Sequence, residues 1–388
     1  MTTRFPLATS SWDEAEQQAL QNVIASDRYT MGAYVEEFEN QFAAHFGSKH
    51  AIMVNSGSSA NLIMVAALCY SKNPKIKLNR GDEVIVPAVS WSTTYFPLYQ
   101  YGLRLKFVDI DRETLNYDMA ALSAAVTDKT RAIMVVNLLG NPTDFSALSK
   151  ITEGRDIVMM EDNCESMGAT FGGRPTGTFG VVGSFSSFFS HHISTMEGGL
   201  VLTDDEELYH IMLSLRAHGW TRNLPKFNKV TGEKSDDLFQ ESFRFVLPGY
   251  NLRPLEMSGA LGLEQLKKLP ALIEGRRANA ALFQQRMQGH PKFMIQREIG
   301  ESSWFGFSLV LREGLGLKRA DVVKDLKSVG FECRPIVAGN FAKNDVVAYF
   351  DHEIHGLLPN ADYIDEHGLF VGNHHYPIPE AIELLAAI

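Results

Sequence analysis

Residues 183–199 read Gly-Ser-Phe-Ser-Ser-Phe-Phe-Ser-His-His-Ile-Ser-Thr-Met-Glu-Gly-Gly. Small and aromatic residues alternate at the start of this stretch, which predicts a strand with one apolar face and one face of hydroxyls. The strand runs into a polar loop that carries His191 and His192, and residues 200–203 predict a second strand. Because α/β sheets keep their chemistry at strand ends, the two histidines are candidate functional residues. The alternative is that these side chains only cap the strand and satisfy local hydrogen bonds.

The chain of 388 residues is too long for one compact core. We therefore predict a large domain of residues 1–258 and a smaller C-terminal domain of residues 259–388. An apolar fraction of 45% and a charged fraction of 21% are ordinary for a globular enzyme. The net charge of −10 argues against nucleic acid or an anionic membrane surface as the main partner.

The three cysteines are Cys69, Cys164 and Cys333, an odd number at wide spacing. They predict neither a disulfide framework nor a metal site, which fits a reducing compartment. The first residues lack the apolar core of a signal peptide, and no apolar run approaches the ~18 residues of a membrane span. We expect a soluble cytoplasmic protein with no metal ligand set.

The order of predicted elements favours an α/β fold with a mostly parallel sheet. Helices are predicted at 11–26 and 34–46, and a short buried strand at 51–54 leads through a Gly-containing, hydroxyl-rich turn into another helix. Further near-continuous apolar strands are predicted at 84–87, 106–109, 132–137 and 156–160. Such strands, separated by helical stretches, indicate a sheet that is covered on both faces.

The character of the chain changes after residue 250. Residues 255–269 and 271–287 predict two long helices, and residues 302–311, 319–329 and 331–337 predict strand, helix and strand. This pattern indicates an α+β layer. The polar segment 221–237 is expected to be a mobile or partner-contacting loop.

Ser58, Trp91, Asp162 and His191 all follow predicted strands, so they are expected to converge on one crevice. The Asp162 carboxylate follows an apolar strand and needs a cation, for which a pyridinium nitrogen is one candidate. Trp91 is placed to lie flat against a heteroaromatic ring, and Ser58, the Ser59 amide and Ser186 to hold a phosphate. This set of groups predicts pyridoxal or pyridoxamine phosphate. Taken singly, Asp162 as a helix N-cap and Trp91 as a core aromatic remain open.

Four motifs carry a resemblance to a known family: Ser-Gly-Ser at 56–58, Pro-Ala-Val-Ser-Trp at 87–91, Glu-Asp-Asn-Cys-Glu-Ser-Met-Gly-Ala at 161–169 and Gly-Tyr-Asn-Leu-Arg at 249–253. The chain resembles the sugar-nucleotide aminotransferase/dehydratase family of vitamin-B6 enzymes over about residues 5–377. The resemblance implies the aspartate aminotransferase fold (fold type I). This fold has a large domain with a mostly parallel seven-stranded sheet and a smaller C-terminal α+β domain.

His191 stands where the aminotransferases of this family have the lysine that links covalently to the cofactor. Together with the neighbouring residues it resembles the dehydratase branch, which implies a pyridoxal 5'-phosphate or pyridoxamine 5'-phosphate that is not covalently bound. The implied reaction removes the C3 hydroxyl from a GDP-linked 4-keto-6-deoxy sugar, namely GDP-4-keto-6-deoxy-D-mannose. L-Glutamate serves as the amino donor, ammonia is released, and His191 acts as the catalytic base. An iron–sulfur cluster is not expected, because three scattered cysteines cannot supply four thiolates.

Further roles follow from the resemblance alone. Glu165 is placed near the cofactor's 3-hydroxyl, with Gly57 in the phosphate turn, and Asn251 reaches the phosphate of a neighbouring subunit in a homodimer with shared active sites. Arg253 and Arg334 are candidates for gripping the glutamate carboxylates, although surface ion pairs are equally compatible with them. The predicted substrate-binding residues are Ser190, His218, Arg253, Glu332 and Arg334. For Glu332 the alternative is a simple pair with Arg334, and for His192 we expect a structural role.

Three rival functions remain at this point. The first is a sugar-nucleotide 4-aminotransferase in which His191 carries the proton, and the second is a non-catalytic protein that binds the cofactor. The third, a metal enzyme that uses His191, His192, Asp162 and Glu165, has poor support from their spacing.

Overall fold

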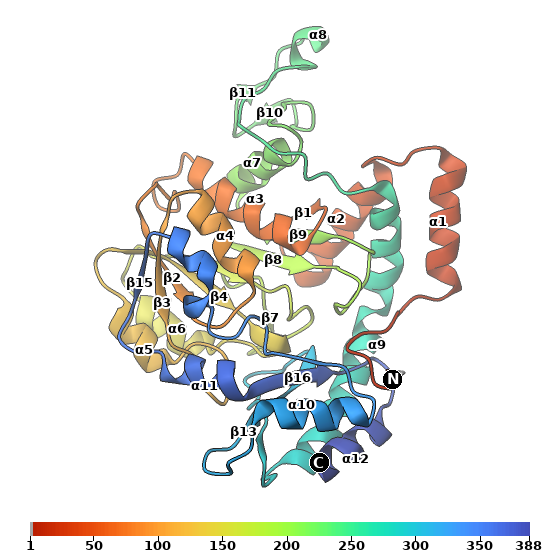
Figure 1. Cartoon of the computed structure of the whole chain (residues 1–388). Helices are drawn as coiled ribbons and strands as arrows, with labels where there is room; N and C mark the ends of the chain where they lie inside the picture. Colours follow the sequence, from red (N-terminus) through yellow and green to blue (C-terminus); the bar gives the residue numbers. More distant parts are fainter. Residues whose placement is uncertain (1–2) are drawn as a thin grey trace.

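An eight-stranded sheet forms the centre of the computed structural model, which describes residues 3–388 (Figure 1). The strand order is β1-β9-β8-β5-β4-β2-β3-β15, and the strands from β8 to β15 in that order pair in parallel. The strand β9 alone runs antiparallel to both of its neighbours. The strands are β1 (His50–Val54), β2 (Glu83–Pro87), β3 (Arg104–Val108), β4 (Thr130–Val136), β5 (Val158–Asp162), β8 (Val182–Ser186), β9 (Gly199–Thr203) and β15 (His352–Ile354).

The predicted number of seven strands is wrong by one. The eighth strand, β15, comes from the C-terminal third of the chain and extends the sheet beside β3. It is only three residues long and reads His-Glu-Ile, so it lacks the apolar run by which the other parallel strands are recognised.

Helices cover both faces of this sheet. They are α2 (Ala33–Phe46), α3 (Gly57–Tyr70), α4 (Ser92–Gln100), α5 (Met119–Ala125), α6 (Phe145–Thr152) and α7 (Glu206–Arg216), whereas α1 (Glu14–Ser26) packs against α9 (Glu256–Met287) on its outer side (Figure 1). Along β1, Ile52 and Val54 join the core formed with α3, α4 and α7, whereas Ala51 and Met53 join the core formed with α2 and α9. Alternate residues of the strand therefore serve opposite faces, as its period of two requires.

One helix, α9 (Glu256–Met287), replaces the two helices that we predicted at 255–269 and 271–287. Pro270 lies inside it. A proline removes one backbone donor from a helix, but here Leu266, Leu269, Leu272 and Ile273 bury a continuous apolar face on both sides of it. Because α9 crosses residue 258, the boundary between the two domains stays a prediction.

A second, four-stranded sheet lies at the C-terminal end of α9 and is antiparallel throughout. Its strands are shorter than the predicted ranges 302–311 and 331–337. They are β12 (Phe293–Met294), β13 (Gly306–Leu311), β16 (Gly368–Gly372) and β14 (Cys333–Arg334), accompanied by α10 (Arg319–Ser328), α11 (Pro359–His367) and α12 (Pro379–Ala387). Stacked Phe283 and Phe307 rings, with centroids 4.1 Å apart, fill the core between α9 and β13.

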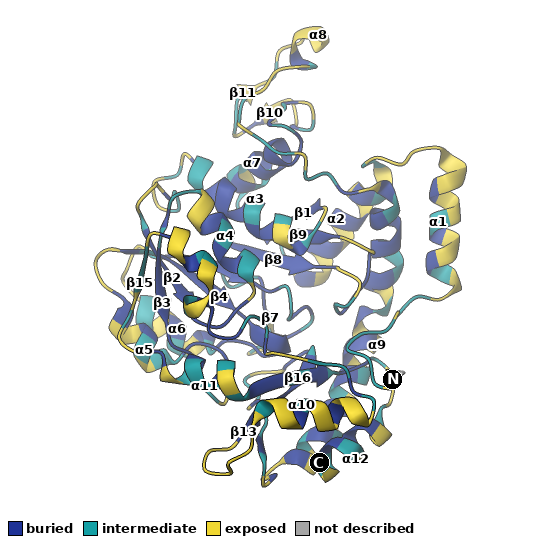
Figure 2. Ribbon diagram, viewed as in Figure 1, coloured by how far each residue is buried: buried dark blue, intermediate teal, exposed yellow. Residues whose placement is uncertain are grey.

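Residues 221–245 form an arm that projects from the body of the molecule (Figure 1). It contains the short strands β10 (Phe227–Asn228) and β11 (Gly232–Glu233) and the single turn α8 (Leu238–Glu241). Most of its large apolar side chains are open to solvent (Figure 2), and Phe239 is 89% exposed, whereas Leu224 is buried. Within residues 3–388 there is no helix with the length and apolar character needed to cross a membrane.

Candidate active site

The turn between β1 and α3 is the candidate phosphate site. Ser56 is the N-cap of α3, and its Oγ accepts the Ser59 N–H at 3.1 Å. The N–H groups of Gly57 and Ser58 have no acceptor in the described part of the chain, residues 3–388, so they are available to an anion at this helix N-terminus. Position 57 requires glycine because a Cβ there would lie 2.7 Å from the Cβ of Ser186. Ser186, at the end of β8, thus closes the turn from one side.

Asp162 ends β5 and is buried, with 6% of its surface exposed. Its Oδ2 accepts hydrogen bonds from Asn61 Nδ2 at 2.8 Å and from Thr94 Oγ1 at 2.7 Å. The Cys164 N–H donates to Oδ1 at 3.2 Å. Among the residues that the structure describes, no Lys, Arg or His pairs with this carboxylate, so a cationic ring nitrogen fits it.

Asn61 and Thr94 are functional residues that the sequence analysis missed. Asn61 lies one helical turn beyond Gly57 and Ser58, and Thr94 lies just after Trp91. The signal for Asn61 was a polar residue within the otherwise apolar stretch that forms helix α3. A residue of this kind needs a polar partner when it is buried, and here that partner is Asp162.

Trp91 precedes α4 and is 56% exposed, so it is not a core aromatic. The Ser58 Oγ donates to Thr93 Oγ1 at 3.1 Å, which ties the phosphate turn to the start of α4. The exposed indole therefore stands beside the same crevice and has a free face for a planar ring.

The loop that carries His191 closes on itself between Ser187 and Gly198. The strand β8 ends at Ser186, which is earlier than the sequence pattern indicated. The Ser187 N–H donates to Gly198 O at 3.0 Å, and the Thr195 N–H donates to Ser187 O at 2.9 Å. A Cβ at Gly199 would lie 2.3 Å from Ser56 O, so the Gly-Gly pair brings this loop against the phosphate turn.

His191 is partly buried, and its ring lies 5.1 Å from the ring of Phe305, centroid to centroid. Burial, with a contribution from the charge of Arg276, lowers the pKa of His191 to about 4. The imidazole is therefore neutral near pH 7 and able to accept a proton. The segments that form the site (55–61, 88–94, 161–166 and 184–199) contain no lysine.

His192 points into the protein, in line with the structural role that we expected. It is 2% exposed, and its Nε2 lies 3.2 Å from Ser303 O. Burial holds its pKa well below the ordinary value. The two histidines lie on a bend where both rings approach Phe305, but His192 is buried and His191 stays partly exposed.

Glu165 accepts a hydrogen bond from the Leu139 N–H at 3.0 Å. Burial, together with the nearby charge of Asp162, raises the pKa of Glu165 to about 7. Its carboxyl is therefore able to change protonation state near neutral pH.

His218, Asn251 and Arg253 form a second cluster. Arg253 Nε donates to Asn251 Oδ1 at 3.0 Å, and its Nη2 lies 3.5 Å from His218 Nε2. The Asn55 N–H donates to Leu252 O at 3.0 Å, which places this cluster beside the phosphate turn of the same chain. Its residues are exposed or partly exposed and open to a ligand or to a second subunit.

Glu332 and Arg334 lie on and beside β14 in the C-terminal sheet, where they form an ion pair at 3.4 Å. The pair with Arg334 is the alternative that the sequence analysis gave for Glu332. The other carboxylate oxygen of Glu332 accepts the Leu7 N–H at 3.1 Å. Ser190 is partly buried near the tip of the His191 loop. The substrate-binding roles of these three residues stay predictions.

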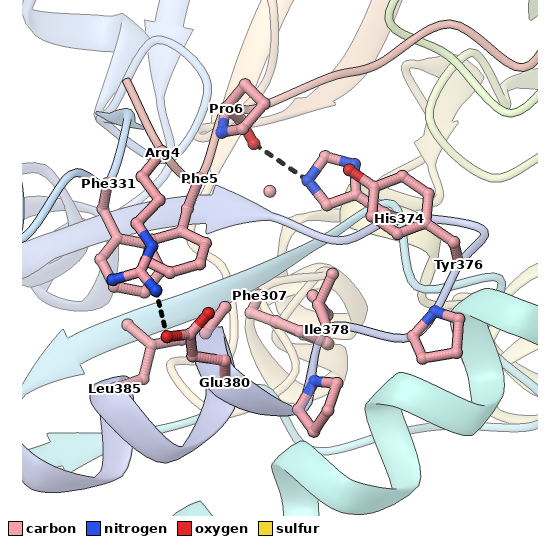
Figure 3. Close-up of a pocket in the computed structure, with 14 residues that line it drawn as sticks. Arg4, Phe5, Pro6, Phe307, Phe331, His374, Tyr376, Ile378, Glu380 and Leu385 are labelled. Carbon is pink, nitrogen blue, oxygen red and sulfur yellow. Dashed lines mark hydrogen bonds and ion pairs between the residues drawn. The ribbon is translucent and has the colours of Figure 1, made fainter. Parts of the chain in front are cut away.

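A cavity of about 340 Å³ lies elsewhere, between the N-terminal segment and α12 (Figure 3). Arg4 and Glu380 form an ion pair at its edge, and Phe5, Phe307 and Phe331 contribute apolar walls. None of the predicted site residues lines this cavity. It is therefore separate from the crevice at the strand ends.

The buried histidines predict that acid destabilises the protein. Burial lowers the pKa of His191 and of His374 to about 4, and that of His192 well below 6.5. Below pH 6.5 the unfolded chain binds protons that the folded chain does not, so each histidine lowers the free energy of unfolding by at most about 1.4 kcal/mol per pH unit. Urea unfolding at pH 7 and pH 5 measures the difference. The His192→Asn variant should show a difference smaller by about 1–2 kcal/mol, and an unchanged difference would contradict this account.

Comparisons with known proteins agree with this geometry. Residues 10–383 match the model of the DegT/DnrJ/EryC1/StrS aminotransferase family. The chain is 63% identical over 382 residues to GDP-4-keto-6-deoxy-D-mannose 3-dehydratase of Yersinia pseudotuberculosis, which covers 98% of this chain and 97% of that protein.

Two solved structures are also similar over nearly the full length. The Escherichia coli GDP-4-keto-6-deoxy-D-mannose-3-dehydratase with bound hydrated PLP matches with a TM-score of 0.98 and 60% identity, over 100% of this chain and 99% of that one. A structure of GDP-4-keto-6-deoxymannose-3-dehydratase with a trapped PLP–glutamate geminal diamine matches with a TM-score of 0.97 and 60% identity, over 99% of both chains. The predicted fold type I is confirmed apart from the strand count. The chain therefore belongs to the DegT/DnrJ/EryC1/StrS aminotransferase family.

Proposed function

We propose that the protein is a dehydratase that uses pyridoxamine phosphate to remove the C3 hydroxyl of GDP-4-keto-6-deoxy-D-mannose. The product is the 4-keto-3,6-dideoxy sugar nucleotide, and L-glutamate restores the amine form of the cofactor. One observation carries the proposal. A neutral imidazole, His191, lies on the loop that packs against the phosphate turn, Asp162 meets only neutral donors within residues 3–388, and the segments that form the site contain no lysine. The Yersinia and Escherichia coli relatives bear the name of this activity.

The side chains present fit the cofactor. Asp162 is suited to hold the proton of a pyridinium nitrogen, because its oxygens are otherwise met only by neutral donors. The Gly57 and Ser58 N–H groups and the Ser186 hydroxyl are suited to hold the phosphate, and Trp91 to cover the ring. When bound, the cofactor supplies the amine that condenses with the C4 ketone and the ring that takes up the electron pair.

His191 moves the proton in this proposal. The imidazole would take up the proton from the carbon that bears the amine and would deliver a proton to the departing C3 hydroxyl, which leaves as water. The lowered pKa keeps the imidazole unprotonated before the transfer and makes its protonated form a strong acid toward the leaving hydroxyl. Without a lysine to displace the product, water completes the release, and the nitrogen leaves as ammonia.

In this proposal Arg253 and Arg334 offer guanidinium groups for the two carboxylates of glutamate, and His218, Ser190 and Glu332 offer polar contacts to the sugar. Arg253 and His218 belong to the second cluster, whereas Ser190 lies on the His191 loop and the Glu332–Arg334 pair lies at β14. A trapped PLP–glutamate adduct in a related structure supports glutamate as the donor.

The proposed working form is a homodimer with shared active sites. The arm of residues 221–245 carries exposed Phe227, Phe239 and Phe243, and Phe188 and Phe189 are exposed on the His191 loop. Aromatic side chains gathered on projecting and rim segments suit burial against a second copy. Asn251, which is exposed, would then reach the phosphate of the partner subunit.

We also propose that the large domain ends at residue 258 and that the smaller C-terminal domain begins at residue 259.

We also place the protein in the cytoplasm. Cys69, Cys164 and Cys333 are all free thiols, which suits a reducing compartment.

One incubation tests the activity. The purified protein is mixed with pyridoxal phosphate, L-glutamate and GDP-4-keto-6-deoxy-D-mannose, and the sugar nucleotide is analysed by mass spectrometry. The expected product is lighter than the substrate by one oxygen atom, with ammonia and 2-oxoglutarate formed in equal amounts. A stable 4-amino sugar without ammonia would show an aminotransferase instead, and unchanged substrate would favour a protein that only binds the cofactor.

A further inference from the structure

The His191 loop is fastened to the rest of the molecule three residues beyond the catalytic histidine. The Ser194 N–H donates to Gln265 Oε1 at 2.9 Å, and Ser194 O accepts the indole N–H of Trp12 at 3.0 Å. Both backbone polar groups of Ser194 are therefore held by side chains from distant segments. Gln265 lies in the middle of α9, and Trp12 lies just before α1.

The Gln265 side chain is itself held in one orientation. Its Oε1 also accepts the Ser11 hydroxyl at 2.6 Å, and its Nε2 donates to Glu16 Oε1 at 2.7 Å and to Ser11 O at 3.3 Å. Gln265 and Glu16 are fully buried. Lys268 Nζ donates to Glu16 Oε2 at 2.6 Å, which compensates the buried carboxylate. The amide that meets Ser194 is thus fixed by further contacts on both its oxygen and its nitrogen.

Further contacts tie the rest of the loop to itself and to the core. The Phe189 N–H donates to Met196 O at 3.1 Å, the His191 N–H donates to Phe188 O at 2.9 Å, and His192 Nε2 lies 3.2 Å from Ser303 O. Ile193 is fully buried in the core, whereas Phe188 and Phe189 are 40% and 46% exposed. At Ser194, both backbone polar groups are held by side chains from outside the loop, so these two bonds constrain the backbone on the C-terminal side of His191.

We propose that Gln265 and Trp12 are positioning residues, which hold His191 at the place where it transfers the proton by clamping Ser194. They touch neither cofactor nor substrate and act through the loop backbone. The inference rests on the proposed function for the chemistry, but the clamp itself is measurable without any substrate. A misplacement of about 1 Å at a reacting group lowers turnover roughly a hundredfold, so the expected effect is large.

Removal of the clamp should loosen the loop, because the buried Ser194 N–H would otherwise have no acceptor. The test compares wild type with Gln265→Leu, with Trp12→Phe and with the double variant. The matched control is Lys267→Met, which removes an exposed ion pair with Glu264 on the same helix and no bond to Ser194, Gln265 or Glu16.

Amide hydrogen exchange by mass spectrometry, on the protein without substrate, is the first readout. We expect exchange in peptides of 188–195 to rise about tenfold or more in Gln265→Leu and in Trp12→Phe, and to stay at the wild-type level in Lys267→Met. The second readout is steady-state kinetics of dehydration. We expect kcat to fall about 10- to 100-fold in Gln265→Leu with KM changed less than about threefold, and Lys267→Met to keep its turnover.

The double variant shows whether Gln265 and Trp12 act together through Ser194 or act independently of each other. If both side chains act on the position of His191 through Ser194, the loss of kcat in the double variant is smaller than the product of the two single losses. Equal losses in Gln265→Leu and Lys267→Met, or unchanged exchange at 188–195, would overturn the proposal. If Gln265→Leu does not fold, Trp12→Phe carries the same test. A wild-type protein that fails to dehydrate the sugar overturns the proposed function and leaves the exchange result standing.

Discussion

The His191→Asn variant is expected to lose dehydration by about 10²- to 10⁴-fold, because an amide cannot take up the proton that the imidazole accepts. The loss should appear in kcat and not in substrate affinity, since His191 acts on the reacting atoms. Single-turnover mass spectrometry of the sugar nucleotide measures it. Cofactor absorbance and the urea midpoint, both expected near wild type, show that the variant is folded and loaded.

The His191→Lys variant tests the same position by introducing the lysine that the aminotransferases of the family have there. The introduced amine should link covalently to pyridoxal phosphate, and borohydride should then fix the cofactor to the peptide that contains position 191. Wild type should give no such adduct, because the segments that form the site contain no lysine. A reduced adduct on any wild-type lysine would contradict the account. Continued formation of the 3-deoxy product in His191→Lys would show that another residue is the base.

The part of the fold that the sequence predicted correctly is the part that depends on local pattern. The parallel strands are continuous apolar runs, and the site residues follow those strands directly, so the pattern alone places Ser58, Trp91 and Asp162 at one edge of the sheet. The resemblance added the role of His191 and the fold type. The strand count failed at β15, where three residues carry too little pattern to identify a strand.

Features that depend on distant contacts were not predictable in this way. Pro270 predicts a helix end, but α9 continues because its apolar face packs against the main sheet and α2. Ser194 and Gln265 are 71 residues apart, and Trp12 is farther still, so no spacing in the sequence connects them. Asn61 and Thr94 were missed because the partner that explains their burial, Asp162, lies on β5, whereas they lie on the helices α3 and α4.

At Asp162, replacement of one carboxylate oxygen by an amide nitrogen is expected to weaken cofactor binding strongly. A carboxylate with 6% exposure and only neutral donors around it is costly unless a cation completes its surroundings. The cationic ring nitrogen therefore gains a strong, charge-assisted hydrogen bond there. The neighbouring donors from Asn61 and Thr94 keep the carboxylate oriented but carry no charge, so their contribution should be smaller.

The Asp162→Asn variant is therefore expected to bind pyridoxal phosphate about a hundredfold more weakly, which corresponds to about 3 kcal/mol, because a neutral amide cannot balance the ring charge. Dehydration should fall at least as much even at saturating cofactor, since a ring without its proton withdraws electrons poorly. Absorbance titration measures the affinity. The matched control is Asn61→Ala, which keeps the carboxylate and removes one donor of 2.8 Å, and it should weaken binding by less than about tenfold. Equal losses in both variants would mean that the Asp162 charge has no special role, and that its place in the hydrogen-bond network alone explains its burial.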